Sequence, residues 1–242
     1  MPSVKEAFVA ALGKPSPRVP SAIHFEDVGM EAVWRRFLAD VGSGWYLDRF
    51  LFLFGEGVER LAPCLDAWAF LVPPRRGDRK ILGRNAHGAL LVLEDAESVE
   101  HNQVHLLDPF RVTYWTDPDL NLFTLIGAWL PRKLLPGFLD DDLYRAWMQV
   151  RRRPLEDDLI LAPKTPEGLG GRFEPRNVQE EEIVAYYRTT GPIYAKALGR
   201  AGSKRGARAE PPGKSAARLK ARSTANAHPK APPRKQTKAR KR

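Results

Sequence analysis

The sequence predicts an α+β protein with a central, mostly antiparallel sheet, flanking helices and a disordered basic C-terminal tail. Two changes of pattern along the chain indicate this class. Short apolar runs separated by turn signals fill the middle of the first 199 residues, whereas helically spaced apolar residues lie before and after them. Near residue 200 the composition changes again, because large apolar residues almost disappear.

Charge is unevenly distributed along the 242 residues, whose formal net charge is +10. Residues 200–242 hold 15 Lys and Arg and a single acid, Glu210. This leaves 24 basic and 28 acidic residues, about −4, in residues 1–199. The tail also has no aromatic residue, and Leu219 is its only large aliphatic one. It cannot bury enough apolar surface to offset the entropy lost on ordering, so we expect it to be disordered.

We expect three parts: residues 1–72, residues 73–199 packed with them, and the tail 200–242. Cys64 is the only cysteine and has apolar neighbours, which predicts a buried thiol and no internal disulfide. The longest apolar stretch, residues 120–130, is too short to cross a bilayer, and the first residues do not resemble a signal peptide. These observations favour a cytoplasmic protein with no membrane partner.

The first part is expected to combine helices with a strand region. Ser3 and Glu6 have the spacing of a capping box and predict a short helix that carries Phe8 and Leu12. A second helix is expected over residues 29–42, where Gly42 can end it. Its apolar positions are Val33, Trp34, Phe37, Leu38 and Val41. Residues 45–55 are expected to contain strand, and residues 57–68 a helix shortened by Pro63.

Five short strands are expected next, over residues 68–73, 80–85, 88–95, 103–109 and 110–116. The turn signals between them include Arg76-Gly77-Asp78 and Asp108-Pro109. Because the linkers are short, the strands should form an antiparallel meander.

Helical periodicity returns after residue 116. Asp117-Pro118 predicts a helix start, followed by a stripe of Leu122, Leu125, Ile126 and Trp129. A second helix is expected over residues 138–153, with an apolar face of Leu139, Leu143, Ala146, Trp147 and Val150. Asn177 and Glu180 have capping-box spacing and predict a last helix, which Gly191-Pro192 should break.

Residues that could carry catalysis or bind a cofactor or metal are sparse. His101 and His105 are four apart but fall in a turn and strand, where they more often face solvent than a metal. His87 is expected in a turn before a strand, without a nucleophile motif. The loop at 161–177 has neither Walker-loop order nor a complete G-x-G-x-x-G, since residue 173 is Phe. We therefore expect no catalytic residue, cofactor or metal, and keep an enzyme using these histidines as the least favoured hypothesis.

The order of motifs resembles two bacterial domains. The segment "WRRFLADVGSGWYLDRFLFLF" followed by "LDAW" resembles the GAD-like domain. The segment from "KILGRNAHGALLVLED" onward is similar to the C-terminal domain of type VI secretion immunity proteins, with Gly83, Arg84 and Gly88 at its motif positions. Leu169-Gly170-Gly171 matches the loop that precedes its last helix. The resemblance covers roughly residues 4–198 and implies that the glycines of this loop let the chain pass close to the sheet.

This resemblance implies a non-enzymatic immunity protein that binds and neutralises a cognate toxic effector. Some members of the family are similar to inhibitors of DNase effectors, and such inhibitors tend to carry acidic patches. The candidate interface residues are therefore acids: Asp140, Asp141 and Asp142 at a helix start, and Glu94 and Asp95 at a strand end.

The tail leaves two interpretations open. It is either a solvated appendage or a weak, nonspecific nucleic-acid contact that works through counterion release. The residues expected to touch phosphates are Lys204, Arg205, Arg234, Lys235, Arg240 and Lys241.

Overall fold

The computed structural model describes residues 3–16, 18–19, 29–55, 58–73, 78–95, 102–135 and 137–202. The tail residues 203–242, with their six candidate phosphate contacts, lie outside these ranges, as does His101. By contacts the chain divides into Met1–Arg200 and Ala201–Arg242. The fold below is that of the first unit.

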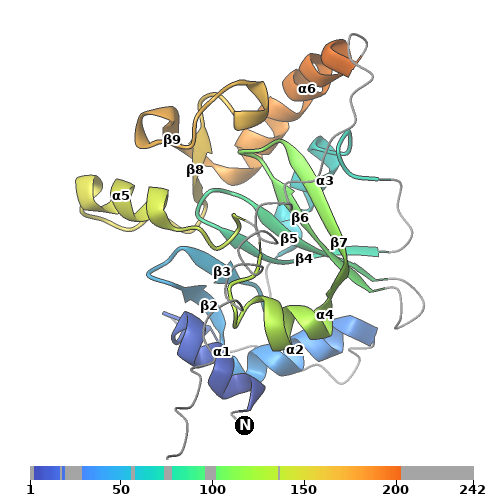
Figure 1. Cartoon of the computed structure of the whole chain (residues 1–242), viewed down its shortest axis with the longest axis vertical. Helices are drawn as coiled ribbons and strands as arrows, with labels where there is room; N and C mark the ends of the chain where they lie inside the picture. The colour runs from blue at the N-terminus through green and yellow to red at the C-terminus, as the bar shows by residue number, and fades with distance from the viewer. Residues whose placement is uncertain are drawn as a thin grey trace, which may run out of the picture. The chain divides into compact units, whose positions relative to one another are not determined.

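A seven-stranded antiparallel sheet confirms the α+β class. Its strands pair in chain order, each with the next, as a meander (Figure 1). β3 pairs with β4, so one sheet joins the two parts expected to meet near residue 72. The strands are β1 (Arg18–Val19), β2 (Ser43–Tyr46), β3 (Leu51–Leu53), β4 (Asp78–Asn85), β5 (Leu90–Asp95), β6 (Gln103–Asp108) and β7 (Thr113–Asn121).

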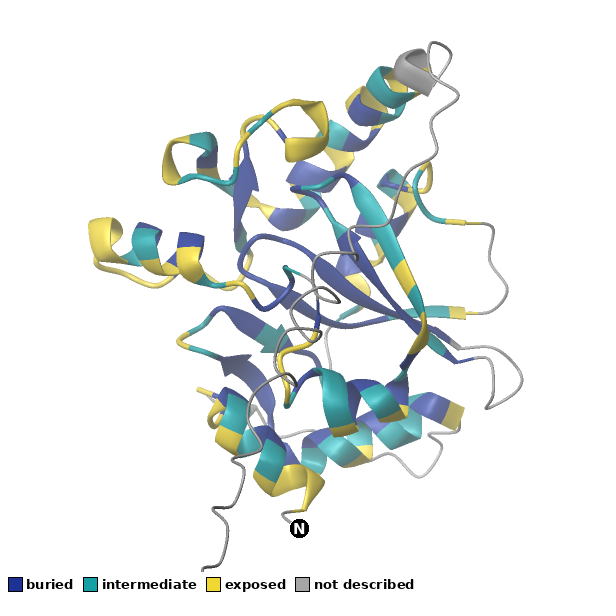
Figure 2. Cartoon of the chain, viewed as in Figure 1, coloured by how far each residue is buried: buried dark blue, intermediate teal, exposed yellow. Residues whose placement is uncertain are grey.

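Helices cover both faces of the sheet, and the central strands are therefore buried on both sides (Figure 2). On one face, Leu91 and Leu93 share a core with Phe8 and Trp34. That core gathers residues of α1 (Val4–Leu12), α2 (Gly29–Val41), α4 (Leu122–Thr124) with the π-helix Leu125–Trp129, and α5 (Asp142–Arg151).

The opposite face has a second core, in which Leu90 and Val92 pack with Trp68 and Tyr187. Its helices are α3 (Ala62–Ala67), preceded by the 3₁₀ turn Glu59–Leu61, and α6 (Ile183–Gly202). A two-stranded sheet of β8 (Leu159–Pro163) and β9 (Val178–Glu182) adds Ile160 and Ala162 to this core. No described helix is long and apolar enough to cross a bilayer.

The first two expected helices are confirmed. The Ser3 side chain accepts from the Glu6 amide and the Glu6 carboxylate accepts from the Ser3 amide, so α1 begins with the expected capping box. α2 ends at Val41 before Gly42, whose φ of 100° lies in the left-handed region that favours glycine.

Residues 68–73 form turns instead of the expected strand. Trp68 follows α3 as its C-cap and lies buried on the second core. Its indole Nε1 donates to Tyr187 O at 3.1 Å. This contact with a helix more than a hundred residues away outweighs the local strand propensity of the segment.

The helix expected to begin at Asp117-Pro118 is also wrong, because β7 continues to Asn121. β7 is the last strand of its sheet, and an edge strand tolerates proline, which lacks a backbone donor. The N-cap of α4 is Asn121, whose side-chain Oδ1 accepts from the Thr124 amide at 3.0 Å.

The last helix starts later than expected. Residues 178–182 form β9, and Asn177 secures the preceding loop by donating to Thr165 O and Arg172 O. Glu182 caps α6 by accepting from the amides of the two residues that follow Ile183. α6 continues through Pro192, contrary to the expected break. The tyrosines of its buried face, Tyr186, Tyr187 and Tyr194, pack in the second core, and their burial opposes the local penalty of about 3 kcal/mol.

α5 forms close to its expected position, but its buried face differs. Leu143, Tyr144 and Trp147 are buried, whereas Val150 is 78% exposed. Residues 149–153 are all exposed, so the last turn has no neighbour against which to bury Val150.

Candidate functional site

The turn between β2 and β3 has an unusual backbone. Leu47, Asp48 and Arg49 have φ values of 52°, 53° and 70°, all in the left-handed region. For residues other than glycine this conformation costs about 1–2 kcal/mol each. The Tyr144 hydroxyl of α5 donates to Asp48 O at 3.2 Å, and the Phe50 amide donates to Tyr46 O at 3.1 Å. One hydrogen bond within the turn and one from α5 therefore hold the strained turn in place, as is common at functional sites.

Asp157 ties the turn to the segment after α5. Its carboxylate forms an ion pair with Arg49 and accepts from Trp45 Nε1 at 2.9 Å. Arg49 also donates to Leu155 O at 3.1 Å. Burial alone would raise the pKa of Asp157, but these two partners lower the pKa below its usual value.

Arg84 lies beneath this network and is buried. Its guanidinium is 4.7 Å from the ring centroid of Trp45, and it donates to Leu159 O at 3.2 Å and to Asp157 O. Burial, together with the charge of Arg60, lowers the pKa of Arg84 to about 10, which leaves the side chain charged at neutral pH. Arg84 therefore fixes the chain around residues 157–159 through charge-assisted hydrogen bonds to carbonyls.

The adjacent Gly83 has a packing role. A Cβ atom there would lie 2.8 Å from Phe52 O and 2.9 Å from Leu53 Cδ2, so a larger residue would push β3 away from β4. Gly88 has a φ of 83°, and a Cβ there would lie 2.7 Å from Ile160 Cδ1. Gly83 and Gly88 thus allow close packing of β3 on β4 and of the turn before β5 on β8.

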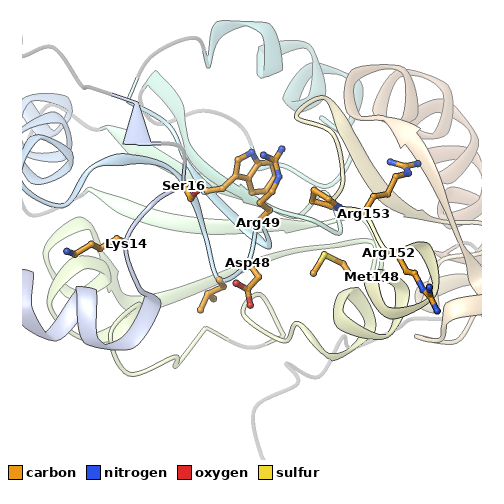
Figure 3. A pocket seen from close by; sticks show the side chains of 10 residues that line it. Lys14, Ser16, Asp48, Arg49, Met148, Arg152 and Arg153 are labelled. Atoms are coloured by element: carbon orange, nitrogen blue, oxygen red, sulfur yellow. The ribbon is translucent and has the colours of Figure 1, made fainter.

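A cleft of about 500 Å³ lies beside the turn. Figure 3 shows Lys14 at one end, Arg152 and Arg153 at the other, and Asp48 and Arg49 between them. Four of the lining residues are basic and one is acidic. The lining is Lys14, Ser16, Trp45, Leu47, Asp48, Arg49, Met148, Arg152, Arg153 and Pro154.

The four basic side chains of the cleft differ in their partners. Arg49 is paired with Asp157, and Arg153 lies 2.5 Å from a carboxylate oxygen of Glu180. Within the described parts of the chain, neither Lys14 nor Arg152 has an ion-pair partner. Two cations at the ends of the cleft therefore remain available to an anionic ligand.

The acids expected at an interface are placed unequally. Asp140 and Asp142 are exposed at the start of α5, while Asp141 pairs with Arg145 at 2.8 Å. Glu94 is buried and pairs with Arg79 at 3.0 Å, so it offers little surface to a partner. Asp95 ends β5, and its side chain is outside the described parts.

The two described histidines of the sheet region are both enclosed. His87 packs edge-on against Phe50, Phe110 and Phe173, at centroid distances of 5.0–5.5 Å. Burial and the charge of Arg111 lower the pKa of His87 to about 3. Its Nε2 atom has no hydrogen-bond partner in the described structure.

His105 does not face solvent, contrary to expectation. It is buried and stacks on Tyr114 with a centroid distance of 4.9 Å, and burial lowers its pKa to about 4. Cys64 is buried, as expected, and burial raises the pKa of its thiol to about 12. Among the described residues no group of three or more His, Cys, Asp or Glu side chains could hold a metal ion.

The loop over residues 161–177 begins as a strand, since β8 leads into it, which the sequence did not suggest. A Cβ at Gly171 would lie 1.8 Å from Thr165 O, and one at Gly168 would lie 2.8 Å from Arg111 O. Close backbone approach therefore explains both glycines. Gly168 passes beside the turn that leads into β7, whereas Gly171 approaches its own loop and a Cβ at Gly170 would meet no atom within 4 Å.

Sequence reasoning did not find the cleft. Lys14, the hairpin segment Trp45–Arg49 and Arg152 come from three segments that are far apart in the sequence, and no short spacing relates them. The run Arg151–Arg153 lies at the C-terminal end of α5, where basic side chains oppose the negative end of the helix dipole, so its charge has a local explanation that does not point to a cleft. Two charged residues shortly after a strand, Asp48 and Arg49 in a turn without glycine, are the local signal that could have pointed to it.

Comparisons with known proteins bear on the fold alone. No protein-family model matches the sequence, and no curated protein matches it. A crystal structure of Atu4351 from Agrobacterium tumefaciens is similar, with a TM-score of 0.52 and 12% sequence identity. The match covers 79% of this chain and 88% of the other. At this identity the likeness concerns the arrangement of the backbone.

Proposed function

We propose that this protein is a non-enzymatic immunity protein that binds a cognate secreted bacterial effector in the cytoplasm and neutralises it. The order of its motifs supports this proposal through their resemblance to a GAD-like domain followed by an immunity-protein domain. Of the motif residues, Arg84 packs on Trp45, which lines a surface cleft, and Gly83 and Gly88 allow close packing within the fold, which suits a scaffold that presents a binding surface.

The observation that carries the proposal is the strained turn at residues 47–49. Three consecutive left-handed residues are held by Tyr144 and by the pairing of Arg49 with Asp157, and they present charged side chains at the cleft. Strain of this kind persists where the surroundings fix a geometry that function requires. A rigid surface also reduces the entropy lost on binding, which favours tight association with a protein partner.

The enclosed titratable groups also favour binding over catalysis by these residues. His87 lies among three phenylalanines, with a pKa far below neutral. The pKa of Cys64 is far above neutral. A general base works best with a pKa near the working pH, and a cysteine nucleophile needs its thiolate form.

Capture and rescue experiments test the proposal together. The full chain serves as bait in nuclease-treated lysate of its own organism at 300 mM salt, and the captured proteins are identified by mass spectrometry. We expect one specific partner that is toxic when expressed alone and harmless when co-expressed with this chain. Failure to rescue growth from any captured protein would contradict the immunity function.

Nucleic-acid association through the tail is a second candidate, favoured by the 15 basic residues and single acid of residues 200–242. Such binding should weaken steeply as salt rises, because each neutralised phosphate releases counterions. Removal of residues 203–242 should abolish it. Binding of an oligothymidylate that is insensitive to both changes would exclude this role for the tail.

A further inference from the structure

Building on the proposed function, we infer that the cleft beside the β2–β3 turn binds an acidic segment of the effector. Lys14 and Arg152 receive its carboxylates at the two ends of the cleft. The partner is thus a protein segment that carries separated Asp or Glu side chains.

The two unpaired cations of the cleft favour an anionic ligand. Arg49 and Arg153 already pair with carboxylates, whereas Lys14 and Arg152 have no such partner in the described structure. Arg152 is the C-cap of α5, where the helix dipole is negative, and its left-handed backbone (φ 53°) turns the chain out of the helix. A ligand carboxylate would give each of these two cations the ion pair that it lacks.

Nucleic acid fits the same cleft less well. Single-stranded nucleic acid stacks its bases on exposed aromatic side chains, but Trp45 is only 1% exposed and lies against Arg84 and Arg49. Asp48 lines the cleft, and Asp157 and Glu180 pair with its arginines. These carboxylates would repel a continuous row of phosphates, whereas a protein segment can alternate acidic and basic side chains.

The basic tail of the same chain is an unsuitable occupant. Residues 200–242 carry 15 basic side chains and one acidic one, and the cleft is itself lined by four basic side chains. Like charges repel at the distances of direct contact, so an external acidic partner is favoured over the tail. The size of the cleft, about 500 Å³, suits a few side chains of an extended segment.

Peptide titrations of the full chain test the cleft without the effector. Backbone amide NMR shifts are followed in 150 mM salt while hexaglutamate, hexaglutamine or an oligothymidylate is added. We expect hexaglutamate alone to shift the amides of residues 14, 47–49, 152 and 153. Shifts confined to the tail, or a stronger response of these amides to oligothymidylate, would overturn the inference.

A matched pair of double variants separates the cleft from general charge. Lys14→Gln with Arg152→Gln removes the two unpaired cations, and Arg132→Gln with Lys196→Gln removes two exposed cations elsewhere. Both keep the tail and lower the net charge equally. We expect the first pair to weaken hexaglutamate binding at the cleft about ten- to hundredfold and the second to leave it unchanged. Equal effects of both pairs, at unchanged melting temperature, would overturn the inference.

The effector experiment distinguishes failure of the inference from failure of the proposed function. A captured partner that is lost only from the Lys14/Arg152 variant supports both. A partner held equally by all three proteins overturns the role of the cleft but leaves the immunity function standing. If rescue fails with every captured protein, the immunity function is contradicted. An effector segment is then also excluded as the occupant of the cleft, whatever the peptide titration shows.

Discussion

Acid should destabilise this protein through His87. The imidazole is buried among Phe50, Phe110 and Phe173, and burial lowers its pKa from 6.5 to about 3. The neutral form is therefore favoured in the folded chain, while the unfolded chain takes up a proton first as the pH falls. The stability linked to His87 is complete above pH 6.5 and is lost progressively from pH 6.5 down to about pH 3.

The size of this effect follows from the difference between the two pKa values. Each pH unit between them changes the free energy of unfolding by about 1.4 kcal/mol. Between pH 7.5 and pH 5.0, His87 should therefore remove about 2 kcal/mol of stability. His105, with a pKa lowered to about 4, acts in the same direction, so the contribution of His87 must be isolated with a variant.

Urea unfolding of wild type and His87→Leu at several pH values between 7.5 and 5.0 measures this contribution. Leucine has a similar volume and removes the unpartnered Nε2 atom, so we expect the variant to fold at pH 7.5. It should lose about 2 kcal/mol less than wild type by pH 5.0. His228→Leu, in the tail segment, is the control and should follow wild type. Equal pH slopes for wild type and His87→Leu would refute the reasoning.

Three further predictions follow from buried contacts. Gly171→Ala should lower the free energy of unfolding by about 1–3 kcal/mol, because its Cβ would lie 1.8 Å from Thr165 O. Gly199→Ala, on α6 with no atom within 4 Å of the new Cβ, should raise it slightly; equal shifts of the two urea midpoints would contradict the close approach at Gly171. Arg84→Met should lose about 2–4 kcal/mol and speed hydrogen exchange at residues 157–159, and unchanged exchange would show that Arg84 does not hold this segment. Cys64, with a pKa of about 12, should react with a thiol reagent at pH 8 only on unfolding, and fast reaction of the native protein would contradict its burial.

Much of the fold could be predicted because its signals are local. The capping box of Ser3 and Glu6, the helical spacing around Trp34, and the turns of the meander each lie within a few residues of the structure they specify. The burial of Cys64 could be predicted for the same reason, since its apolar neighbours in sequence share its core. Local propensity and hydrophobic periodicity act at this range, so the sequence alone carried them.

The errors lie where distant contacts compete with a local signal. Asp117-Pro118 has the pattern of a helix start, yet these residues lie in the irregular part of the edge strand β7, between Thr116 and Asn121, which both pair with β6. Asn177 and Glu180 have capping-box spacing, yet pairing with β8 makes residues 178–182 a strand. In both segments strand pairing, of the flanking residues in the first and of residues 178–182 themselves in the second, outweighs a short-range cap worth about 1 kcal/mol.

The sequence by itself determined the α+β class, the contrast between an acidic body and a basic tail, and the first two helices, because these follow from composition and short-range periodicity. Only the tertiary structure decided that Glu94 and His105 are buried, since burial depends on what packs above a strand. It alone brought Lys14, Trp45, Arg49 and Arg152 around one cleft. A cleft formed by segments more than a hundred residues apart exists only after the chain has folded, so no spacing along the sequence could reveal it.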